Sequence, residues 1–412
     1  MISVQNHLQP LSGNKLWFII FTCSCLAACS PKTGTGKLPQ IVTVEKAAKP
    51  PVKVDAKLKE ADVSLLLPFN LHRIKVSSAS KIETEKSALA IDYYQGFKLG
   101  LDSVAASTGM NFRLNVLDTR DNNIQITTLL KSGQLSGSKL IVGPVFPDGI
   151  RFITNYSIAN NIPVVSPLAA SHPGEFNNPH LISMVNNIEV HAERIGAYIS
   201  GKYDPDKTVI ALISTRKPDD ELLAVPLRHY FQQGKGIRFS FEEYSSVFTM
   251  ETKKQPGKEY VVLLTSAERP FVVATIDKLV KMKGAGARLS LFGHPNWLKQ
   301  NYNTDKLQAL NTKITSSYMV DYKSPAVVSF IKKYRKVYNF EPGEYSFKGF
   351  DTGLYFARLL AEHGISFLKY LPQEKYKGLQ NSFSFVRDEK LGYINTSLLL
   401  LEYKNYALNP VE

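Results

Sequence analysis

Short apolar runs alternate with helical patterns along most of this chain, and this alternation restricts its fold more than any other feature. The run VSLLLPF (63–69) is almost entirely apolar, which is typical of a strand buried on both faces. In 87–107, apolar residues recur at every third or fourth position, as on the buried face of a helix. The segment 111–119 alternates apolar and polar residues, which predicts an edge strand. This order of strands and helices predicts a parallel sheet with helices on both faces.

The alternation continues to about residue 293 and falls into two series of similar size. The first series adds predicted helices near 123–133 and 148–160, and predicted strands at 139–146, 162–171 and 180–184. The second series has predicted helices near 188–202, 218–233 and 268–283, and predicted strands at 208–214, 237–244, 259–266 and 288–293. Two such series predict two doubly wound α/β lobes, because right-handed crossovers place helices on both faces of each sheet. We expect Gly96 and Gly100 to let helix 87–107 lie close on its sheet.

The composition excludes a disulfide-stabilised fold for the main part of the chain. The three cysteines, Cys23, Cys25 and Cys29, all lie near the start of the 412 residues. The rest of the chain must therefore be stabilised by apolar cores, which a chain of this length can form. The formal net charge is +14, but the basic residues are dispersed apart from short runs such as KKYRK (332–336). This favours a solvated basic surface, with attraction to anionic lipid or cell-wall polymer as the alternative.

The first 28 residues have the features of an export signal. Lys15 precedes LWFIIFTCSCLAA, an uncharged stretch shorter than the roughly 20 residues that a membrane-spanning helix needs. LAAC (26–29) resembles the lipobox of bacterial lipoproteins. The resemblance implies cleavage before Cys29 and attachment of lipid to this residue. A plain signal peptide with chance cysteines is the alternative.

Residues 29–61 are predicted to be a flexible, lipid-anchored linker. They are polar, rich in Pro, Lys, Thr and Gly, and lack an apolar period. Ser30 stands where an aspartate would favour retention in the inner membrane in the enterobacterial scheme. The lipobox resemblance therefore implies a cell-envelope protein that is anchored in the outer membrane and faces the periplasm. For an exported lipoprotein we expect no nucleic-acid partner.

The order of motifs in the body of the chain resembles type I periplasmic binding proteins, the leucine-binding-like proteins of transport systems. The motifs are LLLPF, YYQGFKLGLDS, VLDT, IVGPV, IPVVSP and NPHLI, followed late in the chain by a GYD-type helix start that stands here as Gly349-Phe350-Asp351. The resemblance covers about residues 62–410. GFDTG, GLQNSFSF and GYIN also resemble a lipoprotein branch of Bacteroidetes-type bacteria. That branch is related to the outer-membrane lipoprotein activators of penicillin-binding proteins.

The resemblance implies an α/β fold of two Rossmann-like lobes with parallel central sheets, joined by three crossings of the chain. We place these crossings near Asn186, Tyr322 and Pro372. The first lobe would then comprise 62–186 and 322–372, and the second lobe 187–321 and 373–412.

Candidate ligand-binding residues follow from the strand ends. Ligands of open parallel sheets sit outside the carboxyl ends of the strands, and in a two-lobed protein that edge lines the cleft. Hinge motion can then close the lobes on a ligand. The candidates are Phe69, Asn70, Asp118, Thr119, Pro144, Val145, Ser166, Pro167, Leu168, Ser214, Thr265, Ser266, His294 and Trp297. The alternative for each is a residue that caps a helix or fills the lobe interface.

The usual carboxylate cradle of the amino-acid binders is only partly present. The resemblance implies hydroxyl and N–H groups after the third and fourth strands, and Ser166 and Ser171 match the fourth position. At the third position the chain has Gly143-Pro144-Val145-Phe146, where Pro144 has no N–H and the next two residues have no hydroxyl. The cleft is therefore expected to bind a different kind of ligand, such as a more apolar one, or no small ligand.

Three further residues have competing interpretations. Trp297 could stack on a ligand from a cleft loop or pack beneath that loop. His294 could contact a ligand or be a hydrogen-bonded structural residue. Asp351 is expected to stabilise the start of its helix rather than contact ligand.

The sequence favours recognition over catalysis. The S-x-x-K matches lack the context of penicillin-recognising enzymes, and we find no nucleophile elbow, P-loop, dinucleotide fingerprint or zinc motif. We therefore expect no catalytic residue, metal or cofactor. The predicted function is a lipid-anchored lipoprotein that binds a small solute, such as an amino acid or peptide, as ABC-type substrate-binding proteins do. The alternative is a protein-interaction module that regulates peptidoglycan synthesis through a cell-wall synthesis protein.

Overall fold

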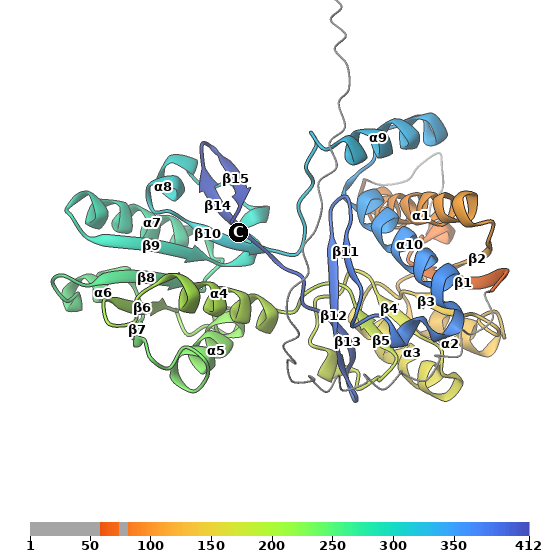
Figure 1. The fold of residues 1–412 in the computed structure, drawn as a ribbon, viewed down its shortest axis with the longest axis horizontal. Coiled ribbons are helices and arrows are strands. Elements are labelled where there is room, and N and C mark those ends of the chain that lie inside the picture. The colour runs from red at the N-terminus through yellow and green to blue at the C-terminus, as the bar shows by residue number, and fades with distance from the viewer. Residues whose placement is uncertain (1–57, 74–80, 412) are drawn as a thin grey trace, which may run out of the picture. The chain divides into compact units, whose positions relative to one another are not determined.

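Two α/β lobes form the part of the chain that the structure, a computed structural model, describes, namely residues 58–73 and 81–411 (Figure 1). The predicted signal peptide and Cys29 lie outside these residues. The linker was predicted to extend to residue 61, and this end is wrong because the first strand begins at Glu60. Within the described ranges, no helix is both long and apolar enough to span a membrane.

The first lobe is built on an eight-stranded sheet with the strand order β11-β12-β13-β5-β4-β3-β1-β2. Its strands are β1 (Glu60–Leu67), β2 (Asn111–Asp118), β3 (Leu140–Val142), β4 (Val164–Ser166), β5 (Leu181–Ser183), β11 (Lys375–Lys377), β12 (Ser382–Asp388) and β13 (Gly392–Asn395). Its helices are η1 (Leu71–Arg73), α1 (Lys81–Thr108), α2 (Asn123–Lys131), α3 (Pro147–Asn160), η2 (Pro173–Glu175), α9 (Pro325–Tyr338), α10 (Glu344–His363) and η4 (Gly364–Lys369). Strands β1 to β5 pair in parallel, and helices cover both faces (Figure 1).

The burial of these strands follows the sequence patterns. Strands β3, β4 and β5 are buried at every position, as expected for apolar strands covered on both faces. Strand β2 lies at the sheet edge, which confirms the prediction from its alternating pattern. The main core of the lobe packs Val63 and Leu65 of β1 against Tyr93 and Phe97 of α1 and Phe356 of α10.

Glycines bring α1 and α10 into close contact. A Cβ at Gly96 would lie 1.9 Å from the Ser346 carbonyl oxygen, and one at Gly349 would lie 2.1 Å from the Tyr93 carbonyl oxygen. The helices can therefore cross only because these positions have no side chain. The prediction that Gly96 and Gly100 let this helix lie close on its sheet was wrong, since both glycines face α10.

The second lobe is built on a seven-stranded sheet with the order β15-β14-β10-β9-β8-β6-β7. Its strands are β6 (Thr208–Ile213), β7 (Ser240–Tyr244), β8 (Glu259–Leu264), β9 (Arg288–Gly293), β10 (Lys313–Ser316), β14 (Leu399–Lys404) and β15 (Ala407–Pro410). Its helices are α4 (Ile188–Lys202), α5 (Pro218–Gln232), α6 (Val247–Lys253), α7 (Arg269–Gly284), η3 (Pro295–Lys299) and α8 (Thr304–Ala309). The order β7-β6-β8-β9-β10 repeats the order β2-β1-β3-β4-β5 of the first lobe, so these five strands have the same topology in both lobes.

The chain passes between the sheets after β5, after β10 and after β13. Strand β13 pairs with β5 of the first sheet through Tyr393 and Ile182, whereas β14 pairs with β10 of the second. Residues 375–395 therefore belong to the first sheet, and the boundary predicted near Pro372 is corrected to residues 396–398. Asn395, the last residue of β13, connects this strand to its neighbours, because its amide donates to the carbonyl oxygens of Met184 (2.9 Å) and Ser382 (3.1 Å).

Candidate functional site

A cavity of about 650 Å³ lies where residues of both lobes meet, and we call it the interlobe pocket. The first lobe contributes the loop after β4 and the first crossing, including Ser171, His172, Glu175 and Asn186. The second lobe contributes the starts of α4 and α5 and the loop after β9, including Glu189, His191, Asp219, Asp220, Leu222 and His294. The volume is within the roughly 300–1,000 Å³ that is common for small-ligand sites.

Local hydrogen bonds fix the first-lobe wall of this pocket. The Gly174 N–H donates to His172 Nδ1 (3.0 Å), which starts the η2 turn. Glu175 at the end of that turn pairs with Arg151 of α3 (3.1 Å). The loop after β4 is therefore tied both to itself and to a helix of its own lobe.

Asn186 at the first crossing is buried, with 2% of its surface exposed. Its Nδ2 donates to the carbonyl oxygen of Asn395 (2.8 Å), whereas its Oδ1 has no hydrogen-bond partner among the described residues. Because the amide nitrogen is held by a carbonyl acceptor, the orientation of the amide is determined. A residue of the pocket lining therefore has a buried acceptor that lacks a donor among the described residues.

Two buried histidines line the second-lobe wall. His191 Nδ1 lies 2.8 Å from Thr315 Oγ1, and His294 Nδ1 accepts from the Asn296 N–H (3.0 Å). Burial lowers the pKa of His191 to about 3 and that of His294 to about 4, although Asp220 and Asp219 act on His294 in the opposite direction. Both imidazoles are therefore neutral near pH 7 and add no positive charge to the pocket.

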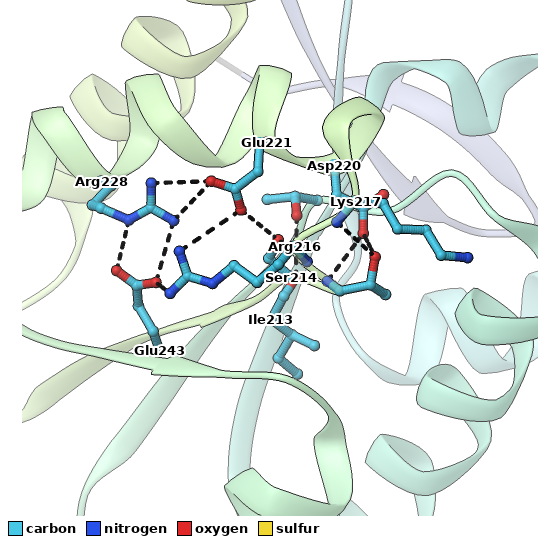
Figure 2. Close-up of polar contacts among 10 residues, drawn as sticks. Ile213, Ser214, Arg216, Lys217, Asp220, Glu221, Arg228 and Glu243 are labelled. Carbon is cyan, nitrogen blue, oxygen red and sulfur yellow. Dashed lines mark hydrogen bonds and ion pairs between the residues drawn. The ribbon is translucent and has the colours of Figure 1, made fainter.

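A polar network at the carboxyl end of β6 holds the start of α5 in place (Figure 2). The Thr215 N–H and hydroxyl both donate to Asp220 Oδ2, at 3.1 and 2.7 Å. Farther along α5, Arg228 contacts Glu221 (3.2 Å) and Glu243 of β7 (2.7 Å). Figure 2 also shows Arg216 beside Glu243, which it contacts as an ion pair. The network fixes the backbone that presents Asp219 and Asp220 to the pocket.

A second cavity of about 500 Å³ lies within the first lobe, between the loops after β2 and β3, and we call it the lobe-1 pocket. The predicted candidates Thr119, Pro144 and Val145 line this pocket rather than the interlobe pocket. Ile124 and Phe146 are 78% and 43% exposed at its wall. The Gly143-Pro144 peptide bond is cis.

His294 is the only predicted candidate that lines the interlobe pocket within the described part of the chain. Ser171, which matched the fourth-strand position of the amino-acid binders, also lines it. Trp297 is fully buried, and its Nε1 donates to the Ser266 carbonyl oxygen (2.8 Å). It therefore packs beneath its loop and is not available to stack on a ligand.

The remaining candidates make contacts within their own lobe. Ser214 donates to Glu221, Thr265 donates to the Ile213 carbonyl oxygen, and Ser266 accepts from the Glu268 N–H. Asp118 accepts from the N–H groups of Asn70, Leu71 and Arg120, and so braces the loop after β1. Phe69, Ser166, Pro167 and Leu168 are buried or partly buried in the first lobe.

Asp351 has a different role from the predicted one. It lies in the third turn of α10, not in the first, and is fully buried. Its carboxylate accepts from the N–H groups of Leu379 (2.7 Å), Gln380 (2.9 Å) and Asn381 (2.9 Å). The expectation of a helix-start effect was wrong, because this residue instead holds the turn between β11 and β12.

Sequence reasoning missed most of the polar residues in the interlobe pocket. Asn186, Glu189 and His191 lie just before or within the first turn of α4, after β5, a strand whose end supplied no candidate. Asp219 and Asp220 lie in the first turn of α5, a few residues after the candidate Ser214. The first turn of a helix points its side chains over the same edge as the strand end before it. Counting forward to the predicted helix starts would have found them.

Comparisons with known proteins show the fold. No protein-family model matches the sequence, and no curated protein matches it either. A putative branched-chain amino acid ABC transporter structure from Rhodospirillum rubrum matches with a TM-score of 0.63 and 14% identity, over 85% of this chain and 100% of the other. An ABC transporter substrate-binding protein from Desulfitobacterium hafniense in complex with Leu matches with a TM-score of 0.52 and 14% identity, over 85% and 100%.

A structure of a different functional class matches about as well. The C-domain of LpoA from Haemophilus influenzae, a regulator of PBP1A, matches with a TM-score of 0.54 and 15% identity, over 85% of this chain and 100% of the other. The matched structures share the two-lobed fold of type I periplasmic binding proteins, and this chain has that fold. Identities this low do not by themselves show a shared ligand or partner.

Proposed function

We propose that this protein is a non-catalytic binding protein of the cell envelope that holds a small solute in the interlobe pocket. The observation that carries the proposal is that one cavity of about 650 Å³ is lined by polar side chains from both lobes. A ligand bound there contacts both lobes at once, so it favours the arrangement in which they close around it. The structural similarity to substrate-binding proteins of ABC transporters supports this proposal.

The absence of catalysis is part of the same proposal. The histidines of the pocket have lowered pKa values, and each uses its Nδ1 in a contact with its own lobe. Among the described residues that line the pocket, no serine, threonine or cysteine hydrogen-bonds to either histidine and could be activated by it as a nucleophile. The Thr315 hydroxyl that contacts His191 is not part of the lining. Among the described residues, no group of three or more His, Cys, Asp or Glu side chains is placed to hold a metal ion.

A thermal-shift screen of the full-length chain tests solute binding. A compound that binds the native state raises the unfolding temperature, because binding lowers the free energy of the native state and not that of the unfolded state. We expect a shift with some member of a broad set of amino acids, peptides, amines and muropeptides. Leu222→Arg, which introduces a bulky charge at the pocket wall, should abolish that shift. A broad set without any shift would contradict the proposal.

We also propose that lipid on Cys29 anchors the protein to the outer membrane, facing the periplasm. The support is the lipobox-like LAAC sequence and the polar segment that follows it. In cells, Cys29→Ser should move the protein from the membrane fraction to the soluble periplasmic fraction. Cys25→Ser is the matched control, because it removes a nearby thiol but leaves the lipobox intact. Membrane retention of the Cys29 variant would contradict the anchor.

A second candidate function is an interaction with a cell-wall synthase, and the similarity to the PBP1A regulator LpoA favours it. The lobe-1 pocket offers a surface for such a contact, since Ile124 and Phe146 expose large apolar side chains there. This function would be supported if the protein pulls down a penicillin-binding protein from the same cell and if Ile124→Ser weakens that interaction. The solute-binding proposal instead predicts that Ile124→Ser leaves the thermal shifts unchanged.

A further inference from the structure

The charged side chains of the interlobe pocket all have the same sign. Glu175, Glu189, Asp219 and Asp220 line it, and within the described part of the chain no lysine or arginine does. The whole chain has 50 basic and 36 acidic residues, so a wall with only acidic charges is the opposite of the chain's overall charge balance. The two buried histidines are neutral near pH 7 and do not offset these carboxylates.

Two of the four carboxylates are available to a ligand. Glu175 pairs with Arg151, and Asp220 accepts from Thr215. Glu189 and Asp219 are exposed and form no ion pair with any residue in the described ranges. These two negative charges, one from the start of α4 and one from the start of α5, face the cavity without a counter-charge.

Asn186 provides a second and independent observation. Asn186 lines the same cavity, and its buried Oδ1 lacks a donor among the described residues, while its Nδ2 is held by Asn395. A buried acceptor without a partner costs about 1–3 kcal/mol. A ligand N–H directed at this oxygen would recover that energy, whereas a ligand carboxylate would meet another acceptor.

The helix starts around the cavity give no compensating attraction for an anion. Asn187 accepts from the Val190 N–H at the start of α4, and His294 accepts from the Asn296 N–H at the start of η3. The first turn of α5 already carries three acidic residues. Side chains of the protein thus occupy the places where a ligand carboxylate would otherwise bind.

We propose that the interlobe pocket binds an organic cation, an amine or guanidine without a carboxylate, through Glu189, Asp219 and the Oδ1 of Asn186. This inference rests on the proposed function, because it names the class of solute. The opposing interpretation is that Glu189 and Asp219 only stabilise the starts of their own helices. The two interpretations differ in whether these residues affect ligand affinity.

The experiment compares three probes of one chain length that differ only in charge: 1,5-diaminopentane, 5-aminopentanoate and glutarate. Each is titrated into the full-length protein by calorimetry, together with a thermal-shift measurement. We expect the diamine to bind tightest and glutarate not to bind. Raising the salt concentration should weaken the binding of the diamine, since the carboxylates are exposed and salt screens their attraction for a cation.

Charge-neutral variants test the residues. Glu189→Gln and Asp219→Asn should each lower the affinity for the diamine by about two- to fivefold, as expected for exposed charges. Glu193→Gln is the matched control, because it removes an exposed acid four residues farther along α4 that pairs with Lys235 outside the pocket. Variants that change stability but leave diamine affinity at the control value would overturn the proposal.

The outcomes separate this inference from the proposed function. Binding of 5-aminopentanoate or glutarate at least as tight as that of the diamine would overturn the cation proposal but leave solute binding intact. No binding by any of these probes, followed by none in the broad screen, would overturn both. Tightest binding of the diamine, lowered by both pocket variants and not by Glu193→Gln, supports both.

Discussion

Asp351 shows how one buried side chain joins distant segments of the first lobe. It is on α10, yet its carboxylate holds the N–H groups of residues 379–381. The same turn contacts the second crossing, because the Met319 N–H donates to the Gln380 carbonyl oxygen (2.9 Å). Burial raises the pKa of Asp351 from 3.8 to about 6, even though the three N–H groups act to lower it.

This pKa makes stability depend on pH in a definite direction. The folded state binds the Asp351 proton more tightly than the unfolded state, whose pKa is near 3.8. The stabilisation is therefore fully present below about pH 3.8 and is lost as the pH rises through about 6. We predict that the free energy of unfolding of the wild type, minus that of Asp351→Asn, falls by up to about 3 kcal/mol between pH 4 and pH 7.

Denaturant unfolding of both proteins across this pH range is the measurement. Subtracting the variant cancels the titration of the other acidic residues, which the two proteins share. A difference that stays constant with pH would contradict the raised pKa. A difference that increases with pH would mean that the three N–H groups outweigh burial.

At the scale of elements, the contact between α1 and α10 depends on glycine. We predict that Gly349→Ala lowers the free energy of unfolding by about 1–3 kcal/mol, because its Cβ would overlap the backbone of α1. Gly201→Ala on α4 is the control, since a Cβ there meets no atom within 4 Å. This second variant should not lower stability and should raise it by up to about 1 kcal/mol, because alanine is the better helix former. Equal effects of the two variants in chemical denaturation would argue against close packing of the helices.

The network of Figure 2 connects α5 to β7 and makes a second prediction at this scale. Glu243 is 20% exposed and contacts both Arg216 and Arg228. Glu243→Gln removes a carboxylate that both guanidinium groups contact, and it should lower the free energy of unfolding by about 1–2 kcal/mol. Glu193→Gln, which breaks an exposed pair, should cost less than about 0.5 kcal/mol. Similar losses in thermal or urea unfolding would show that the network is no stronger than a surface pair.

The elements also show what the sequence could and could not predict. Apolar period alone located most strands and helices, because burial on one or both faces is a local pattern. Helix α6 (Val247–Lys253) and α8 (Thr304–Ala309) are too short to show a period, and they were not predicted. The site was harder, because strand ends identify the correct edge but not which side chains face the cavity. Trp297 is the clearest example, since it is on a cleft loop but points into the core.

At the scale of the molecule, the main error was the sheet to which the last strands belong. Strands β12 and β13 lie in the segment 373–412, which was predicted to belong to the second lobe. Their sheet is instead set by the pairing of β13 with β5, some two hundred positions earlier. No local pattern contains that information. The outcome is that the chain crosses three times, and the third crossing follows Asn395, whose side chain also bonds to the first crossing at Met184.

This topology predicts that removing the end of the chain damages only one lobe. A chain that ends at Asn395 lacks β14, which pairs with β10 and buries Leu400 and Leu401. It also loses the ion pair between Lys313 and Glu402 (2.7 Å). Hydrogen exchange should therefore become faster in β9 and β10 while β3 and β4 of the first sheet keep their protection.

A chain that ends at Lys404 is the matched control for this truncation. It keeps β14 and loses only β15, whose residues are mostly exposed, so its exchange in β9 and β10 should stay close to that of the full chain. Faster exchange in both sheets after truncation at Asn395 would mean that the lobes unfold together.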